Sequence, residues 1–348
     1  MARTLLELPP VGGHGRIWHH VLVELAQRVE IVATPQRGIG RRLRRGGPQV
    51  LLADGHEWLP QAPVPVVAYV HEAGWFTPEL RAVLDPEFLA HIEPRTLAAM
   101  RAADQVIVPS RAVRADLIRE LSVPEWCVHA VPHGIDPIFR PGLAGGRELV
   151  AAAAGRDRGV PYVLYAATLH PRKNLGALRT AIAQLAGEGL PHLLVIAGHA
   201  APDRRSSAEL EAAAAAELPG APGRVVRVGE PNDRELAALM GGAAAFCLPS
   251  LYEGFGLTAL EALACGSPVV VSDRGALPEV VADAALVVAP QPGEIAAALR
   301  RILGDPDLAA RLAAAGPRRA AEFSWERMAD GWWEILRGAA ASPYTRRL

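Results

Sequence analysis

Cysteine is scarce in this 348-residue chain, which has only Cys127, Cys247 and Cys265. Their odd number and wide spacing provide neither a disulfide framework nor a Cys-x-x-Cys zinc motif. Long apolar runs are missing too: none approaches the roughly eighteen residues of a membrane-spanning helix, and the one near the N-terminus is too short for a signal peptide. These absences predict a protein of the reducing cytoplasm. Any contact with a membrane would be peripheral, at the inner face of the membrane.

A net charge of one sign is also missing. Lys plus Arg number 36 and Asp plus Glu number 37, which argues against a protein that coats nucleic acid, so we expect no nucleic-acid partner. One stretch, RGIGRRLRRGG, is strongly basic and carries five arginines between Arg37 and Arg45. It fits a peripheral contact with an anionic membrane face or a phosphorylated acceptor, or, as we favour, a solvated loop.

The chain does have an alternation of short β-branched runs with alanine-rich amphipathic segments, the pattern of parallel sheets with crossover helices. In the first half, strands are expected at 4–8, 30–33, 49–53, 66–70, 105–108 and 127–131, and helices at 16–27, 86–102 and 112–120. In the second half, strands are expected at 162–166, 192–197, 225–228, 244–248, 268–272 and 285–288, and helices at 175–188, 207–216, 233–240, 258–264, 293–303 and 307–319. We predict an α/β fold of two Rossmann-like, doubly wound domains that face an interdomain cleft.

The junction between these domains is expected in the stretch 140–159, RPGLAGGRELVAAAAGRDRG. It is rich in glycine and proline at its start and charged at its end, which is typical of a loop. The first domain therefore comprises 1–145, and the second begins at 146.

Two acids flank a glycine-rich turn in LYEGFGLTALEALACG, residues 251–266. Glu253 precedes Gly254, Phe255 and Gly256, and Glu261 lies one turn inside the helix that follows. The unpaired amides of a helix N-terminus favour phosphate, and the glycines allow a ligand close to the backbone. The spacing suits a nucleotide-sugar, with Glu261 on the ribose and Glu253 on the second sugar ring. The alternative is that both acids only complement the helix dipole.

Two adjacent cations follow the first strand of the second half, in VLYAATLHPRKNLGALRTAI. Arg172 and Lys173 precede Asn174, which we expect to cap the next helix. A solvated Arg-Lys turn is the simpler interpretation. We prefer a diphosphate site because the pair is expected at the same end of the same sheet as the two glutamates.

The combination of Pro-Arg-Lys-Asn with Glu-Gly-Phe-Gly and a second glutamate eight residues after the first resembles the retaining GT-B glycosyltransferases of family 4, the group 1 glycosyltransferases. Further stretches that resemble this family are VPHGIDPIFRP (131–141), VIAGHA (195–200), VVRVGEPNDRELAALM (225–240) and SDRGALPEVVADAALVVAP (272–290). The C-terminal stretch resembles the family's closing helices, which implies a nucleotide-sugar-binding domain at 146–322 and a helix at 323–348 that crosses back to the N-terminal domain, with Trp332 and Trp333 as packing residues.

The resemblance implies roles for individual residues. The catalytic residues it implies are His71, Arg172, Lys173 and Glu253. The donor-binding residues it implies are Gly12, Gly13, Gly198, Val228, Gly254, Phe255, Gly256, Leu257 and Glu261. In the family, the equivalent of His71 faces the sugar across the cleft and the equivalents of Arg172 and Lys173 hold the diphosphate. For Gly12 and Gly13 an ordinary strand–helix turn remains the alternative, and for His71 a structural role.

No metal or other cofactor is expected. Asp305 and Asp307 match the Asp-x-Asp that metal-dependent transferases use, but they open an alanine-rich helix far from the glycine turns, so we interpret them as helix caps. Many members of the family have an arginine where this chain has Thr168. The resulting Thr-x-x-Pro-Arg-Lys-Asn pattern resembles a subgroup of mannosyltransferase-like enzymes.

The activity that the resemblance implies is metal-independent, retaining transfer of a hexose from a nucleotide-diphosphate sugar. GDP-mannose-like donors are favoured and UDP-sugars remain open; the acceptor is a hydroxyl of a saccharide, a lipid-linked glycan or a small molecule. Two alternatives are a sugar-nucleotide 2-epimerase of the same fold and a noncatalytic partner subunit that binds sugar nucleotides.

Overall fold

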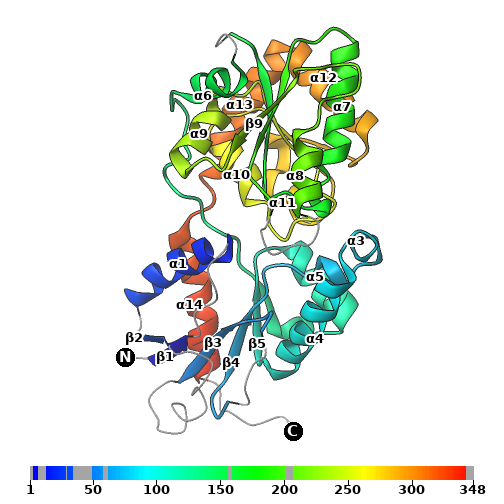
Figure 1. Cartoon of the computed structure of the whole chain (residues 1–348). Helices are drawn as coiled ribbons and strands as arrows, with labels where there is room; N and C mark the ends of the chain where they lie inside the picture. Colours follow the sequence, from blue (N-terminus) through cyan, green and yellow to red (C-terminus); the bar gives the residue numbers. More distant parts are fainter. Residues whose placement is uncertain are drawn as a thin grey trace. The chain divides into compact units, whose positions relative to one another are not determined.

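The computed structural model describes residues 3–6, 13–28, 30–33, 49–57, 62–155, 159–200 and 207–341. The chain divides into two compact units (Figure 1). The N-terminal unit comprises Met1–Gly134 together with Phe323–Leu348, and the C-terminal unit comprises Ile135–Glu322. The division thus falls at Gly134, before the stretch 140–159 in which the sequence placed the junction.

The N-terminal unit is built on a parallel sheet with the strand order β2-β1-β3-β4-β5-β6. Its strands are β1 (Arg3–Leu6), β2 (Glu30–Ala33), β3 (Val50–Asp54), β4 (Val66–Tyr69), β5 (Gln105–Val108) and β6 (Val128–Ala130). Every residue of β3 and β4 is buried. Such strands are covered on both faces, so they read as continuous apolar runs in the sequence.

Helices cover both faces of this sheet (Figure 1). They are α1 (Gly13–Ala26), η1 (Gly74–Phe76), α3 (Pro78–Arg81), α4 (Pro86–Ala102), α5 (Arg111–Leu121), η2 (Glu125–Cys127) and α14 (Trp325–Ala341). The first turns of α4 and α5 are capped by the side chains of Asp85 and Ser110, which accept hydrogen bonds from the backbone amides of Glu87 and Val113. Ser110 thus has a structural role.

The C-terminal helix α14 packs beside α1 on one face of the N-terminal sheet (Figure 1). Trp332 is fully buried there, and its ring lies 5.5 Å from that of Trp18 and 4.9 Å from that of Tyr69, between ring centroids. Trp333 is partly buried against the same cluster. The apolar stripe of α14 therefore completes the core of a sheet whose strands all lie between Arg3 and Ala130, far earlier in the sequence.

The C-terminal unit has a second parallel sheet, with the order β12-β11-β10-β7-β8-β9. Its strands are β7 (Tyr162–Ala166), β8 (Leu193–Ala197), β9 (Val225–Gly229), β10 (Ala245–Leu248), β11 (Val269–Ser272) and β12 (Leu286–Val288). The strand order reverses at β7, which is the first strand of the unit and lies between β10 and β8. In doubly wound sheets, ligands bind beyond the carboxyl ends of the strands at such a point.

Helices flank this sheet as well. They are α6 (Gly146–Ala154), η3 (Pro171–Lys173), α7 (Leu175–Gly187), α8 (Ser207–Ala215), α9 (Asp233–Gly242), α10 (Leu257–Ala264), α11 (Leu277–Val281), η4 (Ala282–Ala284), α12 (Pro292–Gly304) and α13 (Pro306–Ala320). Helices α7, α8 and α12 cover one face, and α6, α9 and α10 lie on the other (Figure 1). Helix α13 contacts α10, and its first half also joins the core under α7 and α12.

The prediction of a loop over 140–159 is wrong for residues 146–154, which form helix α6. The run after Gly146 consists of good helix formers, and its buried Val150 helps the helix to pack against α9. Gly145 and Gly155, both with positive φ, bound the helix. The glycine-rich ends were mistaken for a loop because the short helix between them relies on tertiary packing.

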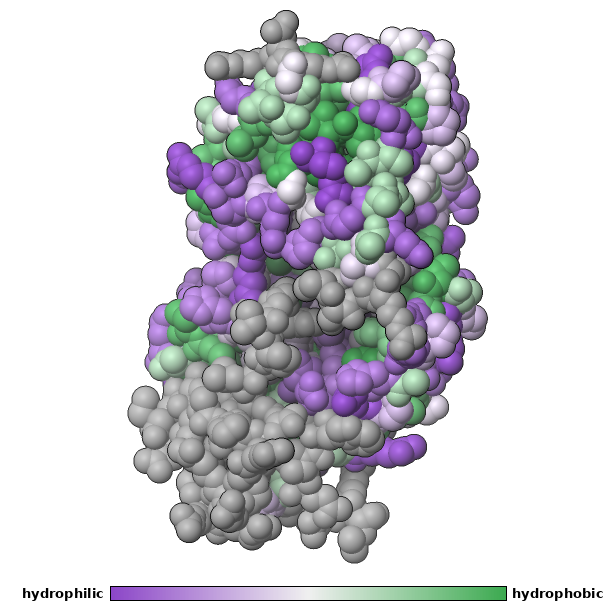
Figure 2. All heavy atoms as spheres, in the orientation of Figure 1, coloured by the Kyte–Doolittle hydropathy of each residue, from purple (hydrophilic) through white to green (hydrophobic). Residues whose placement is uncertain are grey.

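Large hydrophobic side chains of the described residues are mostly buried, and those exposed are Val23, Val83, Trp126 and Val287. Figure 2 shows hydrophilic residues spread over the visible face between smaller hydrophobic areas. Within the described part of the chain, no helix combines the length and apolar character needed to cross a membrane. Cys127, Cys247 and Cys265 are all buried, and none of them forms a disulfide.

Candidate functional site

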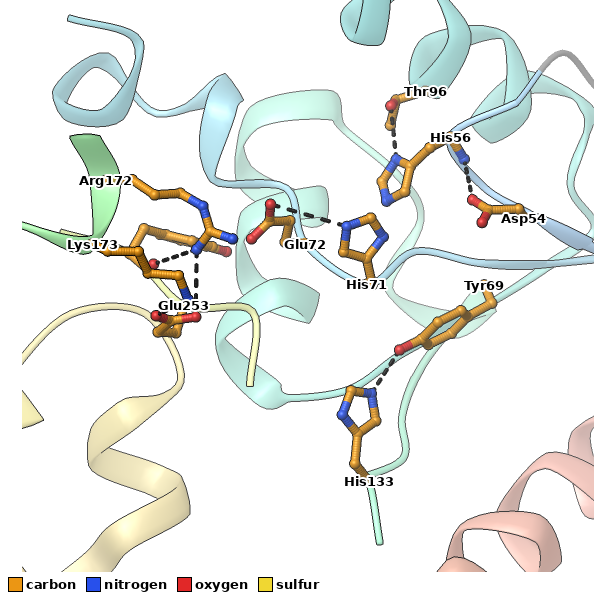
Figure 3. A network of polar contacts seen from close by, with 11 residues as sticks. Asp54, His56, Tyr69, His71, Glu72, Thr96, His133, Arg172, Lys173 and Glu253 are labelled. Atoms are coloured by element: carbon orange, nitrogen blue, oxygen red, sulfur yellow. Dashed lines mark hydrogen bonds and ion pairs between the residues drawn. The ribbon is translucent and has the colours of Figure 1, made fainter. Parts of the chain in front are cut away.

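Strands β7 and β10 lie side by side, and this brings the predicted cations to Glu253. Arg172 and Lys173 belong to η3, which follows β7, whereas Glu253 follows β10. Lys173 Nζ donates to Glu253 Oε1 over 2.6 Å, and Arg172 Nη1 lies 3.4 Å from Glu253 Oε2 (Figure 3). The turns are joined through the backbone as well, because the amide of Leu251 donates to the Arg172 carbonyl over 2.7 Å. Side chains 80 residues apart in the sequence thus form one cluster.

The Glu253 side chain is buried, with 7% of its surface exposed, yet the environment keeps it ionised. Burial by itself raises the pKa of Glu253, but the charges of Lys173 and Arg172 and a hydrogen bond from Ser250 together hold the pKa below its usual value. Ser250 Oγ donates to Oε1 over 2.6 Å. Two cations against one carboxylate leave this cluster with a net positive charge, which favours an anionic ligand.

Asn174 begins α7 but does not cap it with its side chain, so the prediction of a side-chain cap is wrong. Its backbone is left-handed, with φ of 55°, and its Nδ2 donates instead to the carbonyls of Pro249 and Pro290, over 3.1 and 2.9 Å. These carbonyls lie beyond the ends of β10 and β12. Asn174 therefore ties the cation-bearing turn to two other strand ends, which holds Arg172 and Lys173 in place.

The glycine-flanked turn leads from Glu253 into α10 as the sequence predicted. Gly254 and Phe255 are buried, and Gly256 is the residue before the helix, with φ of 95°. A β-carbon at Gly256 would lie 2.6 Å from Leu277 Cδ2, so a side chain there would meet both strain and a clash. The helix begins at the half-buried Leu257, and Glu261 in its second turn is only 2% exposed. The first amides of a helix generally lack a carbonyl one turn earlier, and in α10 the amide of the third residue, Ala259, donates to the Gly256 carbonyl over 3.0 Å.

Gly198 and Val228 lie on the other side of β7, at the ends of β8 and β9. Gly198 has φ of 110°, and a β-carbon on it would come within 2.2 Å of the Ala167 carbonyl oxygen. Its amide donates to the Gly229 carbonyl over 2.7 Å, and its own carbonyl accepts from Arg227 Nη2 over 2.8 Å. Val228 is half-buried. The structure thus places the predicted donor-binding residues of this unit on both sides of the switch point.

His71 lies in the N-terminal unit, just after β4. Its side chain is 18% exposed, and its Nε2 is 4.0 Å from Glu72 Oε1. Its ring packs perpendicular to that of His56, with the centroids 4.2 Å apart, and Trp75 contacts both rings. His71 is therefore held at the carboxyl end of its sheet, where such folds bind ligands.

The remaining predicted residues of the N-terminal unit are described only in part. Gly13 is the first residue of α1. Gly12 and the basic stretch from Arg37 to Arg45 lie outside the described residues. The predicted glycine turn and the predicted membrane or acceptor contact therefore stay predictions.

Asp305 caps α13, as expected for the Asp-Pro-Asp stretch: its carboxylate accepts from the Leu308 amide over 3.0 Å. In the residues that the structure describes, no three or more His, Cys, Asp or Glu side chains are grouped so that they could hold a metal ion. The cationic side chains that contact Glu253 at the candidate site are Arg172 and Lys173.

Two family profiles together match most of the chain. The profile described as Glycosyl transferases group 1 matches residues 147–319, and that of Glycosyltransferase Family 4 matches residues 6–139. The chain belongs to the family 4, group 1 glycosyltransferases.

Curated relatives of this glycosyltransferase include two proteins of Mycolicibacterium species. It is 35% identical over 235 residues to MMP alpha-(1->4)-mannosyltransferase of Mycolicibacterium hassiacum, a match that covers 66% of this chain and 53% of the relative. It is 34% identical over 256 residues to alpha-maltose-1-phosphate synthase of Mycolicibacterium smegmatis, covering 70% of this chain and 65% of the relative. The chain thus spans between about half and two thirds of the length of these relatives.

Solved structures show the same GT-B architecture. HepE of Anabaena, solved in complex with UDP-glucose, superimposes with a TM-score of 0.75 at 18% identity, covering 97% of this chain and 100% of the other. At this identity the likeness shows the fold alone.

Three groups near the proposed site of this glycosyltransferase are not evident from the sequence. Ser250 donates to Glu253, and its own carbonyl accepts from Ser272 Oγ over 2.5 Å. Gly275 lets another loop approach, because a β-carbon there would lie 2.3 Å from the Glu253 carbonyl oxygen. His56 supports His71. Only Ser250 has a local signal, since it lies three residues before Glu253 at a strand end.

Proposed function

We propose that this family 4 glycosyltransferase moves a hexose from a nucleoside-diphosphate sugar to a hydroxyl of a saccharide, a lipid-linked glycan or a small molecule. The transfer retains the anomeric configuration and uses no metal. One observation carries the proposal: Arg172 and Lys173 meet Glu253 beside the N-terminus of α10, at the switch point of the C-terminal sheet.

The diphosphate of the donor is the ligand that this charge arrangement favours. Arg172 and Lys173 are partly exposed, 20% and 12% for the side chains, so each has a donor group accessible to a ligand as well as its contact with Glu253. Their charges and the first amides of α10 favour phosphate oxygens. A bound diphosphate would add two negative charges, which the net positive cluster can accept more readily than a neutral site could.

The two glutamates bind the sugar hydroxyls in this proposal. Glu253 is ionised, and a carboxylate accepts hydrogen bonds only, so it selects hydroxyl donors. We assign the transferred sugar to Glu253 and the turn that follows it, and the ribose to Glu261. Gly198 and Val228, beyond the ends of β8 and β9, contact the nucleotide on the other side of β7.

For the donor we favour a GDP-mannose-like sugar nucleotide. The Mycolicibacterium hassiacum relative is named as a mannosyltransferase, and the Thr-x-x-Pro-Arg-Lys-Asn pattern from Thr168 to Asn174 resembles mannosyltransferase-like members of the family. A UDP-sugar remains the second choice because HepE was solved with UDP-glucose.

The reaction breaks the bond between the anomeric carbon and the diphosphate oxygen and forms a bond from the acceptor oxygen to the same carbon on the same face. The acceptor proton passes to an oxygen of the departing diphosphate. Arg172, Lys173 and the α10 amides stabilise the charge that grows on this leaving group, which is where a fixed positive field lowers the barrier. Glu253 orients the sugar and supports its positive character, and we keep for His71 the sugar contact that the family resemblance implies.

Binding and turnover test this proposal in sequence. The melting temperature is measured with GDP-, UDP-, TDP- and ADP-sugars, since a ligand at about a hundred times its dissociation constant stabilises a protein by about 2.7 kcal/mol. The best donor is then incubated with and without saccharide, lipid-linked and small hydroxyl acceptors, with and without EDTA, and the products are identified by mass spectrometry and NMR of the anomeric proton.

Formation of a glycosylated acceptor with the donor configuration, in EDTA as in its absence, is the expected result. A rearranged donor formed without acceptor would show a 2-epimerase instead, and binding of a donor with no product under any condition would show a noncatalytic binder. Either result overturns the proposed transfer. Loss of turnover in EDTA, restored by a divalent cation, would overturn the metal-free mechanism alone.

A further inference from the structure

Two histidines and a tryptophan meet in the N-terminal unit where β3 and β4 end, and Figure 3 shows the two histidines, His56 and His71. The His56 ring lies perpendicular to that of His71, at 4.2 Å and 87°, and 4.9 Å from that of Trp75. His56 and Trp75 are buried, 6% and 2% exposed, whereas the His71 side chain is 18% exposed. His56 is therefore the inner member of a ring cluster of which His71 is the outer one.

The protonation of His56 can be read from its hydrogen bonds. Its Nδ1 lies 3.1 Å from Oγ1 of Thr96, a fully buried residue of α4 (Figure 3). Thr96 Oγ1 also lies 3.0 Å from the Ile92 carbonyl oxygen, which can only accept, and a hydroxyl whose single proton goes there accepts from His56. This hydrogen-bond arrangement favours the Nδ1–H tautomer of neutral His56, an assignment that the spectra described below test.

The backbone that carries His56 is fixed too. The His56 amide donates to Asp54 Oδ1 over 2.9 Å, and the Gly55 amide donates to the Tyr69 carbonyl over 2.7 Å. A β-carbon on Gly55 would lie 2.4 Å from Val70 Cγ2 and 2.9 Å from the Tyr69 oxygen. The end of β3 thus lies directly against the end of β4, two residues before His71.

We infer that Thr96 and His56 form a positioning pair that fixes the orientation of the His71 ring. Thr96 holds the His56 ring at Nδ1, and the His56 ring, wedged between Trp75 and His71, blocks rotation of His71 from behind. This inference deepens the proposed function and rests on it, because His71 matters only if it contacts the sugar. Neither Thr96 nor His56 needs to touch the substrate.

Thr96→Val and Thr96→Ser separate this role from simple packing. Valine keeps the shape of threonine but cannot accept from Nδ1–H, whereas serine keeps the hydroxyl and loses only a methyl group. A misplacement of about 1 Å lowers turnover by up to about a hundredfold. We expect kcat of Thr96→Val to fall by about tenfold or more with the donor KM within about twofold of the parent, and Thr96→Ser to restore most of kcat.

Thr180→Val is the matched control. Thr180 also donates to the carbonyl four residues earlier, that of Gly176 over 3.1 Å, but it is exposed on α7. It lacks the buried position of Thr96 beside a histidine ring. We expect wild-type kcat and KM for this variant.

A spectroscopic measurement tests the pair without relying on turnover. The full chain is labelled with ¹⁵N-histidine, and long-range ¹H–¹⁵N spectra report which ring nitrogen is protonated; His56 and His71 are assigned from His56→Phe and His71→Ala. In the parent and in Thr96→Ser, His56 should be protonated at Nδ1 with a pyridine-type Nε2. In Thr96→Val, its tautomer balance should shift and the His71 signals should move.

The outcomes distinguish the inference from the function on which it rests. A His56 protonated at Nε2 alone in the parent, or a Thr96→Val with unchanged His71 signals and unchanged kcat, overturns the positioning pair. If His71→Ala itself turns over normally while Thr96→Val moves the His71 signals, the role of His71 in the proposed function fails and the structural pairing stands. Melting temperatures confirm that each variant is folded. If Thr96→Val cannot be obtained, His56→Phe replaces it: this variant keeps a ring but loses the contact with Thr96, and its kcat should fall.

Discussion

The polar groups beside the ends of β7 and β10 and those beside the ends of β3 and β4 occupy equivalent places in two doubly wound sheets, yet their chemistry differs. In the C-terminal unit, Lys173 and Arg172 face a buried carboxylate. In the N-terminal unit, two imidazoles, an indole and a hydroxyl pack together.

The difference fits the two tasks in the proposed reaction. A leaving diphosphate gains charge as the bond breaks, so fixed charges beside it lower the barrier. A sugar ring needs orientation, which rigid rings provide without the cost of burying an ion. One fold can thus provide both functions by changing the side chains that follow its strands.

Removing a cation should have the largest effect. We expect Lys173→Ala and Arg172→Ala each to lower kcat by about 10²–10³-fold, the loss that follows removal of one group that stabilises transition-state charge. Both variants should remain folded, since Glu253 keeps Ser250 and the other cation as partners. Steady-state kinetics with the donor found in the melting screen, together with circular dichroism, would check this.

Arg300→Ala is the control for the loss of an arginine. Arg300 pairs with Glu188 on the surface of the same unit, through two hydrogen bonds of 2.8 and 2.6 Å. Its removal should leave kcat unchanged. Near-normal turnover in both Lys173→Ala and Arg172→Ala would refute the assignment of the diphosphate site.

Neutralising Glu253 tests the ionic cluster from its other side. Glu253→Gln leaves two partly buried cations without their carboxylate, and breaking a buried pair in this way costs about 3 kcal/mol or more. We expect this loss in the free energy of unfolding at pH 7, measured with urea. Glu188→Gln, which breaks an exposed pair, should change it little.

A comparison of the parent with Glu253→Gln at different pH values reports whether the pKa of Glu253 is lowered. Because its pKa is lowered in the folded state, the stability it contributes is fully present above the unfolded value of about 4.3 and is lost as the pH falls through the lower, folded value. The gap in unfolding free energy between the parent and Glu253→Gln should therefore be widest at pH 7 and should narrow below about pH 5. A gap that stays constant down to pH 3 would contradict the lowered pKa.

The two regions also differ in how far the sequence predicts them. Buried parallel strands give continuous apolar runs, so β7 at Tyr162–Ala166 and β5 at Gln105–Val108 begin and end where the pattern placed them. The ionic cluster could be predicted to gather at one sheet end, because Arg172, Lys173 and Glu253 each lie in the segment that follows a strand. The positions of these residues relative to the predicted strands were enough to predict the cluster.

The support of His71 could not be found in the same way. His56 and Thr96 are 40 residues apart, and Thr96 lies in the middle of a helix, where a threonine has no functional signal. Helix α6 and the side chain of Asn174 were mispredicted for a related reason: both depend on tertiary partners that local propensity does not contain. Local patterns thus predict strand ends, and the contacts between them emerge only in the fold.

Each region has a glycine that allows its turns to meet, and replacing these glycines by alanine should destabilise the protein to different extents. Gly275 has φ of 57° and its β-carbon would lie 2.3 Å from a backbone oxygen, so Gly275→Ala should destabilise the protein by about 2 kcal/mol. Gly55 has no positive φ and its closest neighbour is the Val70 methyl, so Gly55→Ala should cost less. Gly176→Ala, in open space on α7, should stabilise by about 0.5 kcal/mol. Thermal unfolding would rank the three variants, and an equal cost at Gly275 and Gly176 would contradict the close approach to Glu253.

A difference of only about 1 kcal/mol in unfolding free energy should separate the hydroxyls that support the two regions. Ser250→Ala removes a hydrogen bond to an ionised carboxylate and should cost about 2 kcal/mol, whereas Thr96→Val removes one to an imidazole and should cost about 1 kcal/mol. The reason is that His56 can move its proton to the other ring nitrogen when its acceptor is lost, but Glu253 has no such way to replace a lost donor. Urea unfolding at pH 7 measures both losses. Equal losses of unfolding free energy in the two variants would contradict the proposed difference between a hydrogen bond to a fixed charge and one to a tautomeric ring.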